Sequence, residues 1–194
     1  MNKGLIIVIV AAIIFLFGGV WACKKRNNFV SLREETRAQW QQLESQYQRR
    51  ADLIPNIVAS VKGEANFEKS TLEAVINARA QATQVKVNLD QLDDANIAKF
   101  KQAQGELSSA LSRLLVVSEN YPNLKANQGF ADLRVELEGC ENRISNERMK
   151  YNNMAKDYNK ELQLFPGSLM AGGFSPAAYF EADKGAEKAP KVEF

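Results

Sequence analysis

No histidine occurs among the 194 residues of this sequence. Histidine is the commonest general base and the commonest metal ligand in proteins, so its absence excludes Ser–His and Cys–His nucleophile pairs. It also excludes the Glu-x-x-His motif on which the di-iron sites of helical bundles depend. We therefore expect a protein that is not an enzyme and that binds no metal and no cofactor.

Cysteine, glycine and proline are also scarce. The two cysteines, Cys23 and Cys140, are far apart in the chain, and one lies at the edge of an apolar segment. A structural disulfide is therefore not expected. Glycine occurs 11 times and proline 5 times, and several of these residues follow Phe165. This distribution is typical of an all-helical protein with an irregular tail.

Charge of one sign is not in excess. The 25 Lys and Arg residues nearly balance 23 Asp and Glu residues, which leaves a formal net charge of +2. No basic run is long enough, or interleaved with enough aromatic side chains, to indicate a nucleic-acid surface. We expect no nucleic-acid partner.

An uncharged apolar segment extends from Leu5 to Ala22. At about 1.5 Å per residue it measures roughly 27 Å, close to the hydrocarbon thickness of a bilayer. Lys3 precedes it, Lys24 to Arg26 follow it, and Trp21 stands where aromatic residues meet the membrane surface. The sequence predicts that residues 1–26 form a single transmembrane anchor that binds membrane lipid through this segment.

Two alternatives to an uncleaved anchor exist. A cleaved signal peptide usually has a shorter apolar region and a more basic start. The residues Val20 to Cys23 resemble a lipobox, in which Cys23 would carry the lipid, although Trp21 fits that motif poorly. We favour the uncleaved anchor. The basic residues that follow the anchor then favour a cytoplasmic body by the positive-inside rule, whereas lipidation would place the body outside.

Apolar residues beyond the anchor repeat with the period of a helix. We expect four helices, over about 28–62, 66–87, 94–119 and 127–164, the first of which is open to continuation with the anchor. Short connections make neighbouring helices antiparallel. Residues 27–164 are therefore predicted to form an up-down antiparallel four-helix bundle with long first and last helices and coiled-coil-like seams. Pro55 lies inside the first helix and is expected to kink it.

The helical pattern stops at Phe165, and residues 165–194 form the predicted irregular tail. Turn signals such as Phe165-Pro166-Gly167 and Gly172-Gly173 interrupt this stretch. Its aromatic and aliphatic residues are too many for a fully disordered tail. We expect part of the tail to dock on the bundle or on a partner.

Charged residues near the middle of the predicted bundle form a candidate site. Arg49, Arg50 and Asp52 flank the apolar face of the first helix, and Glu147 lies on the apolar seam of the last. A carboxylate there must be paired or must raise its pKa, and Arg49 or Arg50 is the expected partner. The cluster is either a register-fixing ion pair, which we favour, or a site for a ligand or partner.

The motif Gln46 to Asn56, QYQRRADLIPN, resembles that of the LemA family of bacterial membrane proteins. Further matching pieces follow in the same order: Val61-Lys62-Gly63, Thr71-Leu72-Glu73-Ala74-Val75, Ala78-Arg79-Ala80, Glu141-Asn142-Arg143-Ile144, Tyr151-Asn152, Phe165-Pro166 and Tyr179-Phe180-Glu181-Ala182. The resemblance implies an anchor in the bacterial inner membrane followed by an antiparallel four-helix bundle. It implies no reaction.

These observations favour a non-enzymatic, single-pass membrane protein that presents a helical bundle to an unidentified protein partner as a scaffold or adaptor. The alternative is a ligand-binding or sensory bundle with a site near Arg49, Arg50 and Glu147.

Overall fold

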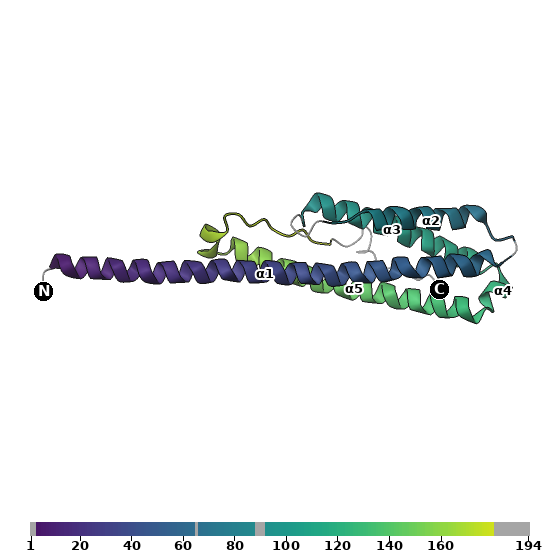
Figure 1. Ribbon diagram of the computed structural model, residues 1–194, viewed down its shortest axis with the longest axis horizontal. Coiled ribbons are helices and arrows are strands. Elements are labelled where there is room, and N and C mark those ends of the chain that lie inside the picture. The colour runs from purple at the N-terminus through teal and green to yellow at the C-terminus, as the bar shows by residue number, and fades with distance from the viewer. Residues whose placement is uncertain (1–2, 65, 88–91, 181–194) are drawn as a thin grey trace, which may run out of the picture.

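The computed structural model describes residues 3–64, 66–87 and 92–180. These residues contain helices and no strand, as the sequence predicts for an all-helical protein. The elements in chain order are α1 (Lys3–Lys62), α2 (Lys69–Gln84), α3 (Asp94–Ser118), α4 (Pro122–Lys125), α5 (Gln128–Gln163) and the 3₁₀ turn η1 (Gly167–Met170). Figure 1 shows them spread along one long axis.

The α1 helix unites the predicted anchor and the predicted first bundle helix in 60 continuous residues. Its amino-terminal part projects alone beyond the other helices (Figure 1), and the side chains from Leu5 to Trp21 are exposed. This part is long and apolar enough to cross a membrane. The helix also runs through Pro55 without an interruption, so the kink expected there stays a prediction.

The α5 helix lies beside α1 and runs in the opposite direction. Glu161, near the end of α5, pairs with Lys25, and Glu136, near its beginning, pairs with Arg49 at 3.2 Å. The side chain of Asn127 starts α5 by accepting a hydrogen bond from the Phe130 amide at 3.1 Å. An asparagine at this position satisfies one of the amides that a helix start leaves without a partner.

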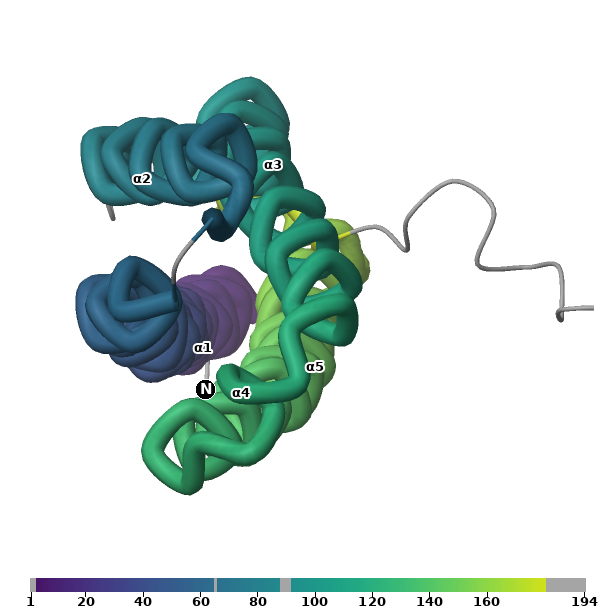
Figure 2. Tube along the Cα trace, turned by 90° about the vertical axis from the view of Figure 1, so that its right-hand side faces the viewer, coloured from purple at the N-terminus to yellow at the C-terminus, as the bar shows by residue number. Residues whose placement is uncertain are grey.

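The α2 and α3 helices pack on each other beside the part of α1 that is remote from its apolar end (Figures 1 and 2). The α2 helix spans less than the predicted 66–87, because Asn66 has a φ of 72° and the chain becomes helical only at Lys69. Asp93 caps α3 through a 2.8 Å hydrogen bond from the Asn96 amide. The expected link at 88–94 lies partly outside the described residues.

Pro122, which the sequence predicts to stop the third helix, begins a short helix of its own. The α3 helix ends at Ser118, and Pro122 then occupies the first turn of the short α4 helix. Proline suits that position, because its fixed φ is helical and its missing N–H would have had no helical partner.

Buried apolar side chains form two clusters along the long axis. The remote cluster gathers Leu53 to Val61 of α1 with α2, the second half of α3 and the start of α5. The proximal cluster gathers Phe29 to Tyr47 of α1 with the start of α3, the rest of α5 and residues 177–180. Position 50 of α1 falls between the two, and the residue there is an arginine.

Candidate functional site

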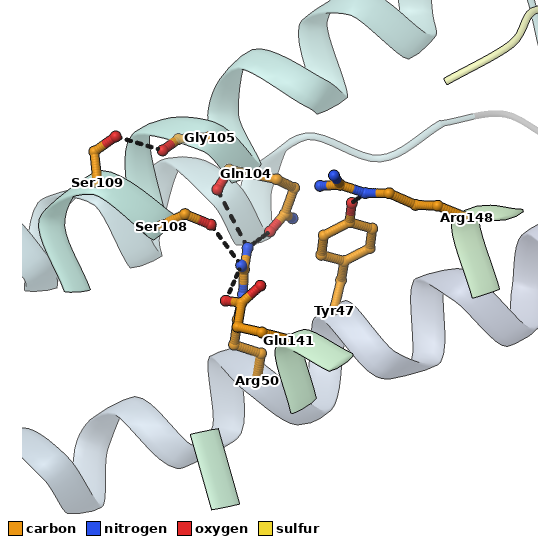
Figure 3. Close-up of polar contacts among 8 residues, drawn as sticks. All are labelled: Tyr47, Arg50, Gln104, Gly105, Ser108, Ser109, Glu141 and Arg148. Carbon is orange, nitrogen blue, oxygen red and sulfur yellow. Dashed lines mark hydrogen bonds and ion pairs between the residues drawn. The ribbon is translucent and has the colours of Figure 1, made fainter. Parts of the chain in front are cut away.

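Arg50 is completely buried between the two apolar clusters. Its Nη1 donates to Glu141 Oε1 at 2.6 Å and to Ser108 Oγ at 2.7 Å. Its Nη2 donates to Gln104, at 2.7 Å to the side-chain oxygen and at 3.2 Å to the main-chain carbonyl (Figure 3). The guanidinium also lies 5.3 Å from the ring centre of Tyr47. We call Arg50, Gln104, Ser108 and Glu141 the Arg50 cluster.

The Arg50 cluster connects every long helix. Arg50 comes from α1 and Glu141 from α5, while Gln104 and Ser108 stand one turn apart on α3. The Gln104 amide also donates to the Ala82 carbonyl of α2 at 3.4 Å. A buried guanidinium with partners on several helices disfavours any other axial alignment, because a shift would leave its charge without acceptors.

A second arginine approaches Tyr47 from α5. Arg148 Nε donates to the Tyr47 hydroxyl at 2.6 Å, and its guanidinium lies 5.6 Å from the Tyr47 ring and 5.5 Å from the Phe180 ring. Burial raises the pKa of Tyr47, and the nearby Arg148 opposes this rise. The hydroxyl is therefore neutral at physiological pH and accepts a hydrogen bond from Arg148 Nε.

The structure corrects the predicted pairing of Glu147. Glu147 accepts from Lys150 at 2.8 Å and from Gln39 at 2.5 Å, and the hydrogen bond from Lys150 lowers its pKa. The carboxylate that meets Arg50 is Glu141. Glu141 lies six positions earlier on α5, which corresponds to about 9 Å of helix axis. The apolar seam of a helix does not specify this axial distance.

The other predicted members of the cluster lie at the surface. Arg49 pairs with Glu136 where both side chains are exposed. Asp52 is exposed and accepts from Gln48 of its own helix at 2.8 Å. The structure therefore does not bring Arg49, Arg50, Asp52 and Glu147 together. Gln104 was missed, although it stands in the apolar stripe of α3 between Phe100 and Leu107 and could have been found there.

Arg79 of α2 donates a hydrogen bond to a carbonyl of α1 that Pro55 leaves without a partner. Proline has no N–H, so the carbonyl of Ala51 lacks its usual partner one turn later. Arg79 Nε of α2 donates to this carbonyl at 2.8 Å. A proline in α1 and an arginine in α2 thus act as a pair that attaches the two helices.

The same pair borders an apolar groove between α1 and α2. The groove has a volume of about 310 Å3 and is lined by Ile54, Pro55, Val58, Ala59, Lys62, Ile76 and Arg79. Two of its lining residues, Lys62 and Arg79, are basic. We call it the α1–α2 groove. Its lining residues on α1, Ile54 to Lys62, belong to the carboxyl-terminal end of that helix, opposite to the apolar segment.

Residues 174–180, the carboxyl segment, lie against α5 and α1. Asn159 donates to the Ala177 carbonyl at 2.7 Å and accepts from the Ala177 amide at 2.8 Å. Asn152 makes the same two contacts with Phe180, each at 2.8 Å. Two asparagines on one helix face thereby satisfy the main chain of a segment that has no helical bonds of its own.

Aromatic side chains fix the same segment. Phe180 stacks on Trp40 with ring centres 5.6 Å apart, and Phe174 meets Phe29 edge-on at 5.5 Å. Tyr151 is fully buried and donates its hydroxyl to the Ala178 carbonyl at 3.0 Å. Val192 and Phe194 are also among the apolar residues for which the sequence predicts docking of the tail, and they lie outside the described part of the chain.

Tyr151 predicts a loss of stability at high pH. Burial, and to a smaller degree the neighbouring Tyr179, raises its pKa above the ordinary value of 10.0. Above about pH 10 the unfolded chain releases this proton and the folded chain keeps it, so the free energy of unfolding falls as pH rises, whereas below pH 10 the effect disappears. We expect wild type to lose about 1 kcal/mol more than Tyr151→Phe between pH 9 and pH 11 in urea unfolding. Equal losses in the two proteins would contradict the burial of this hydroxyl.

The two cysteines differ in their surroundings. Cys23 is exposed on α1 immediately after the apolar segment, and Cys140 is buried in the remote cluster. Among residues 3–64, 66–87 and 92–180, no three Cys, Asp or Glu side chains gather closely enough to hold a metal ion.

Comparison with known proteins decides the family. The sequence profile of the LemA family matches residues 39–194, which include the Arg50 cluster, the α1–α2 groove and the carboxyl segment. The chain belongs to the LemA family. The resemblance seen in the motif around Arg50 is thus confirmed, and the LemA match begins after the apolar part of α1.

Curated relatives of this LemA chain include magnetosome proteins. Magnetosome proteins MamQ 1 and MamQ 2 of Paramagnetospirillum magneticum are each 29% identical to it over 174 residues. Magnetosome protein MamQ of Magnetospirillum gryphiswaldense is 26% identical over 173 residues. These matches cover 79–80% of the chain but only 64% of each relative. Neither the family description nor these names specifies an enzymatic activity, and together with the apolar helix they support a membrane-associated protein.

Proposed function

We propose that this LemA protein is a non-enzymatic, single-pass scaffold, in which Leu5–Ala22 crosses a bacterial membrane and the remaining helices form an antiparallel four-helix bundle. The body holds a binding surface away from the lipid for a protein partner. The exposed apolar part of α1 and the antiparallel pairing of α1 with α5 support this architecture.

The observation that carries the proposal is the α1–α2 groove. It is apolar at its centre and includes the basic residues Lys62 and Arg79. Ile76 on its α2 side is 42% exposed, although it belongs to a helix whose other apolar residues are mostly buried. Grooves of this composition bind the apolar face of an amphipathic helix. The basic residues favour a partner helix whose apolar face is flanked by acidic residues.

A ligand site at Arg50 has less support. The guanidinium already donates to a carboxylate, a hydroxyl and an amide oxygen of the protein itself. A ligand would have to displace these partners inside a packed core. The Arg50 cluster therefore supports a structural role, and the scaffold is the function that we propose.

The orientation of the scaffold follows from charge. Lys24, Lys25 and Arg26 follow the apolar segment directly, so we propose a cytoplasmic body by the positive-inside rule. Lipidation of Cys23 would require the opposite orientation. Activity of a periplasmic reporter fused to the carboxyl end would contradict a cytoplasmic body.

Site-specific photocrosslinking in intact cells tests the scaffold. A photoreactive amino acid at Ala59, which is exposed in the groove, should give a discrete adduct whose partner mass spectrometry can name. Introducing Ile76→Glu should abolish that adduct, because it places a charge in the apolar groove and repels an acidic partner. The same photoreactive group at Val135, which is 69% exposed on α5, is the matched control and should give no such adduct. An adduct that survives Ile76→Glu would contradict binding in the groove.

A further inference from the structure

The turn that follows α5 carries an apolar surface that the described chain leaves uncovered. Phe165 is 80% exposed, Leu169 is 68% exposed and Leu164 is 49% exposed. We call these three residues the turn patch. Single exposed apolar residues are common on soluble surfaces, but a large aromatic and two leucines within one short turn indicate a binding surface.

The turn patch is fixed at the level where the apolar segment of α1 ends. Glu161, just before the patch, pairs with Lys25 and accepts from Asn28 at 3.3 Å. Gly167, inside the turn, packs so closely that an added Cβ would lie 3.3 Å from Lys25 Cε and 3.4 Å from Phe29 Cζ. Figure 1 shows η1 beside α1 at the place where the amino-terminal part of α1 begins to project alone.

Helix geometry places this level close to the membrane surface. The α1 residues that contact Glu161 and Gly167 extend from Lys25 to Phe29, three to seven positions after Ala22, which correspond to about 4.5 to 10.5 Å along the axis. An apolar segment that crosses a bilayer therefore brings the turn patch to the boundary between headgroups and acyl chains. Aromatic and aliphatic side chains are stabilised at that boundary, where apolar surface leaves water.

We propose that the turn patch is a second membrane contact, which inserts into the lipid surface beside the point where α1 leaves the bilayer. This inference rests on the proposed function, because it requires Leu5–Ala22 to span the membrane. Exposed Lys24 and Arg26 at the same level match the anionic headgroups of a bacterial membrane. A lipid surface is the occupant that we propose, because the apolar side chains match the acyl layer and the exposed basic residues match the anionic headgroups that meet at this height.

A second membrane contact beside the anchor would restrict how the body tilts relative to the membrane. A single helix leaves a body free to tilt, whereas an anchor plus a lateral contact holds the α1–α5 pair in one orientation. The α1–α2 groove begins 32 residues beyond Ala22, at Ile54, which places it about 48 Å from the lipid surface along α1. The turn patch would thus present the groove at a constant height above the membrane.

Fluorescence quenching by brominated lipid tests the contact in the full-length protein. The full chain is reconstituted in vesicles of phosphatidylglycerol and phosphatidylcholine whose acyl chains carry bromine near the headgroup end. Trp40 stays in place as an unquenched internal reference, because it is fully buried in the proximal cluster. Phe165→Trp is made in a Trp21→Phe background, with Leu169→Trp as a second probe and Val135→Trp on the remote part of α5 as the control.

The inference predicts strong quenching and a blue-shifted emission for tryptophan at 165 and at 169, and no change at 135. Native Trp21, measured in the unsubstituted chain, reports the anchor separately. Quenching of Trp21 without quenching at 165 or 169 would overturn the second contact and leave the anchor in place. Absence of quenching at positions 21, 165 and 169 would overturn the anchor and, with it, the second contact that depends on the anchor.

Discussion

Glu141→Leu should lower the free energy of unfolding by about 3 kcal/mol, because it leaves the buried Arg50 guanidinium without a counter-ion. Arg50 is completely buried, and Glu141 is its ion-pair partner at 2.6 Å. The Glu141 side chain is 44% exposed, so water replaces part of the lost interaction and the cost lies at the lower end of the range for broken buried pairs. Urea unfolding of the full chain in detergent, followed by far-UV circular dichroism, measures the difference.

Two control variants separate the loss of any carboxylate from the loss of the one that pairs with a buried arginine. Glu136→Leu removes the carboxylate of the exposed Arg49 pair, in which the side chains are 56% and 41% exposed, and should cost less than about 1 kcal/mol. Arg50→Met together with Glu141→Leu removes the buried guanidinium along with its partly exposed partner and should recover most of the loss. Equal effects of Glu141→Leu and Glu136→Leu would show that Arg50 is not buried as described.

Trp40→Ala should cost about 4 kcal/mol, a large fraction of the stability of an ordinary domain. Trp40 is fully buried and contacts three aromatic rings, those of Phe100, Tyr151 and Phe180, at centre distances of 5.3 to 5.6 Å. Its indole N–H has no hydrogen-bond partner in the described part of the chain, so packing is its contribution. The substitution removes the centre of the cluster that joins α1, α3, α5 and the carboxyl segment.

Trp40→Phe is the matched control, because it keeps an aromatic ring in the cluster and should cost clearly less. Trp21→Ala changes the other tryptophan, which lies on the projecting part of α1, and should leave unfolding of the body unchanged. Limited proteolysis adds a second measurement, since Trp40→Ala should also expose residues 174–180 to cleavage. If Trp40→Ala were as stable as Trp40→Phe, the arrangement of the proximal cluster would be contradicted.

The helices could be predicted from the sequence because helix formation depends on residues that are close together in the chain. Apolar residues that repeat every three or four positions predict helices at 94–119 and 127–164. The observed helices α3 (Asp94–Ser118) and α5 (Gln128–Gln163) agree with these bounds to within one residue at each end. The predicted range 66–87 for the second helix is too long at both ends, although the capping-box pattern from Ser70 to Glu73 leaves a later start open: Asn66 adopts a positive φ, and α2 covers only Lys69–Gln84. The extra helix α4 was also missed, because four residues carry too little periodicity to be recognised.

The contacts between helices could not be predicted from the periodicity of the sequence. Periodicity specifies which face of a helix is apolar, but it does not specify how far one helix slides along another. Periodicity therefore predicted Arg49 or Arg50 as the partner of Glu147, whereas Arg50 contacts Glu141 in the structure. The hydrogen bonds of Asn152 and Asn159 could not be predicted from periodicity either, because an asparagine on a helix can face water or contact a main chain.

From its sequence alone this protein is an all-helical chain with one apolar segment of membrane length, no histidine chemistry and the motif of the LemA family. These properties follow from residue type and spacing, which act over a few turns of helix. The tertiary structure alone decided that Arg50 is fully enclosed, that Arg79 replaces the hydrogen bond lost at Pro55, and that Phe165 stands uncovered beside the end of the apolar segment. Each of these depends on residues tens of positions apart, which only the packing of whole helices brings together.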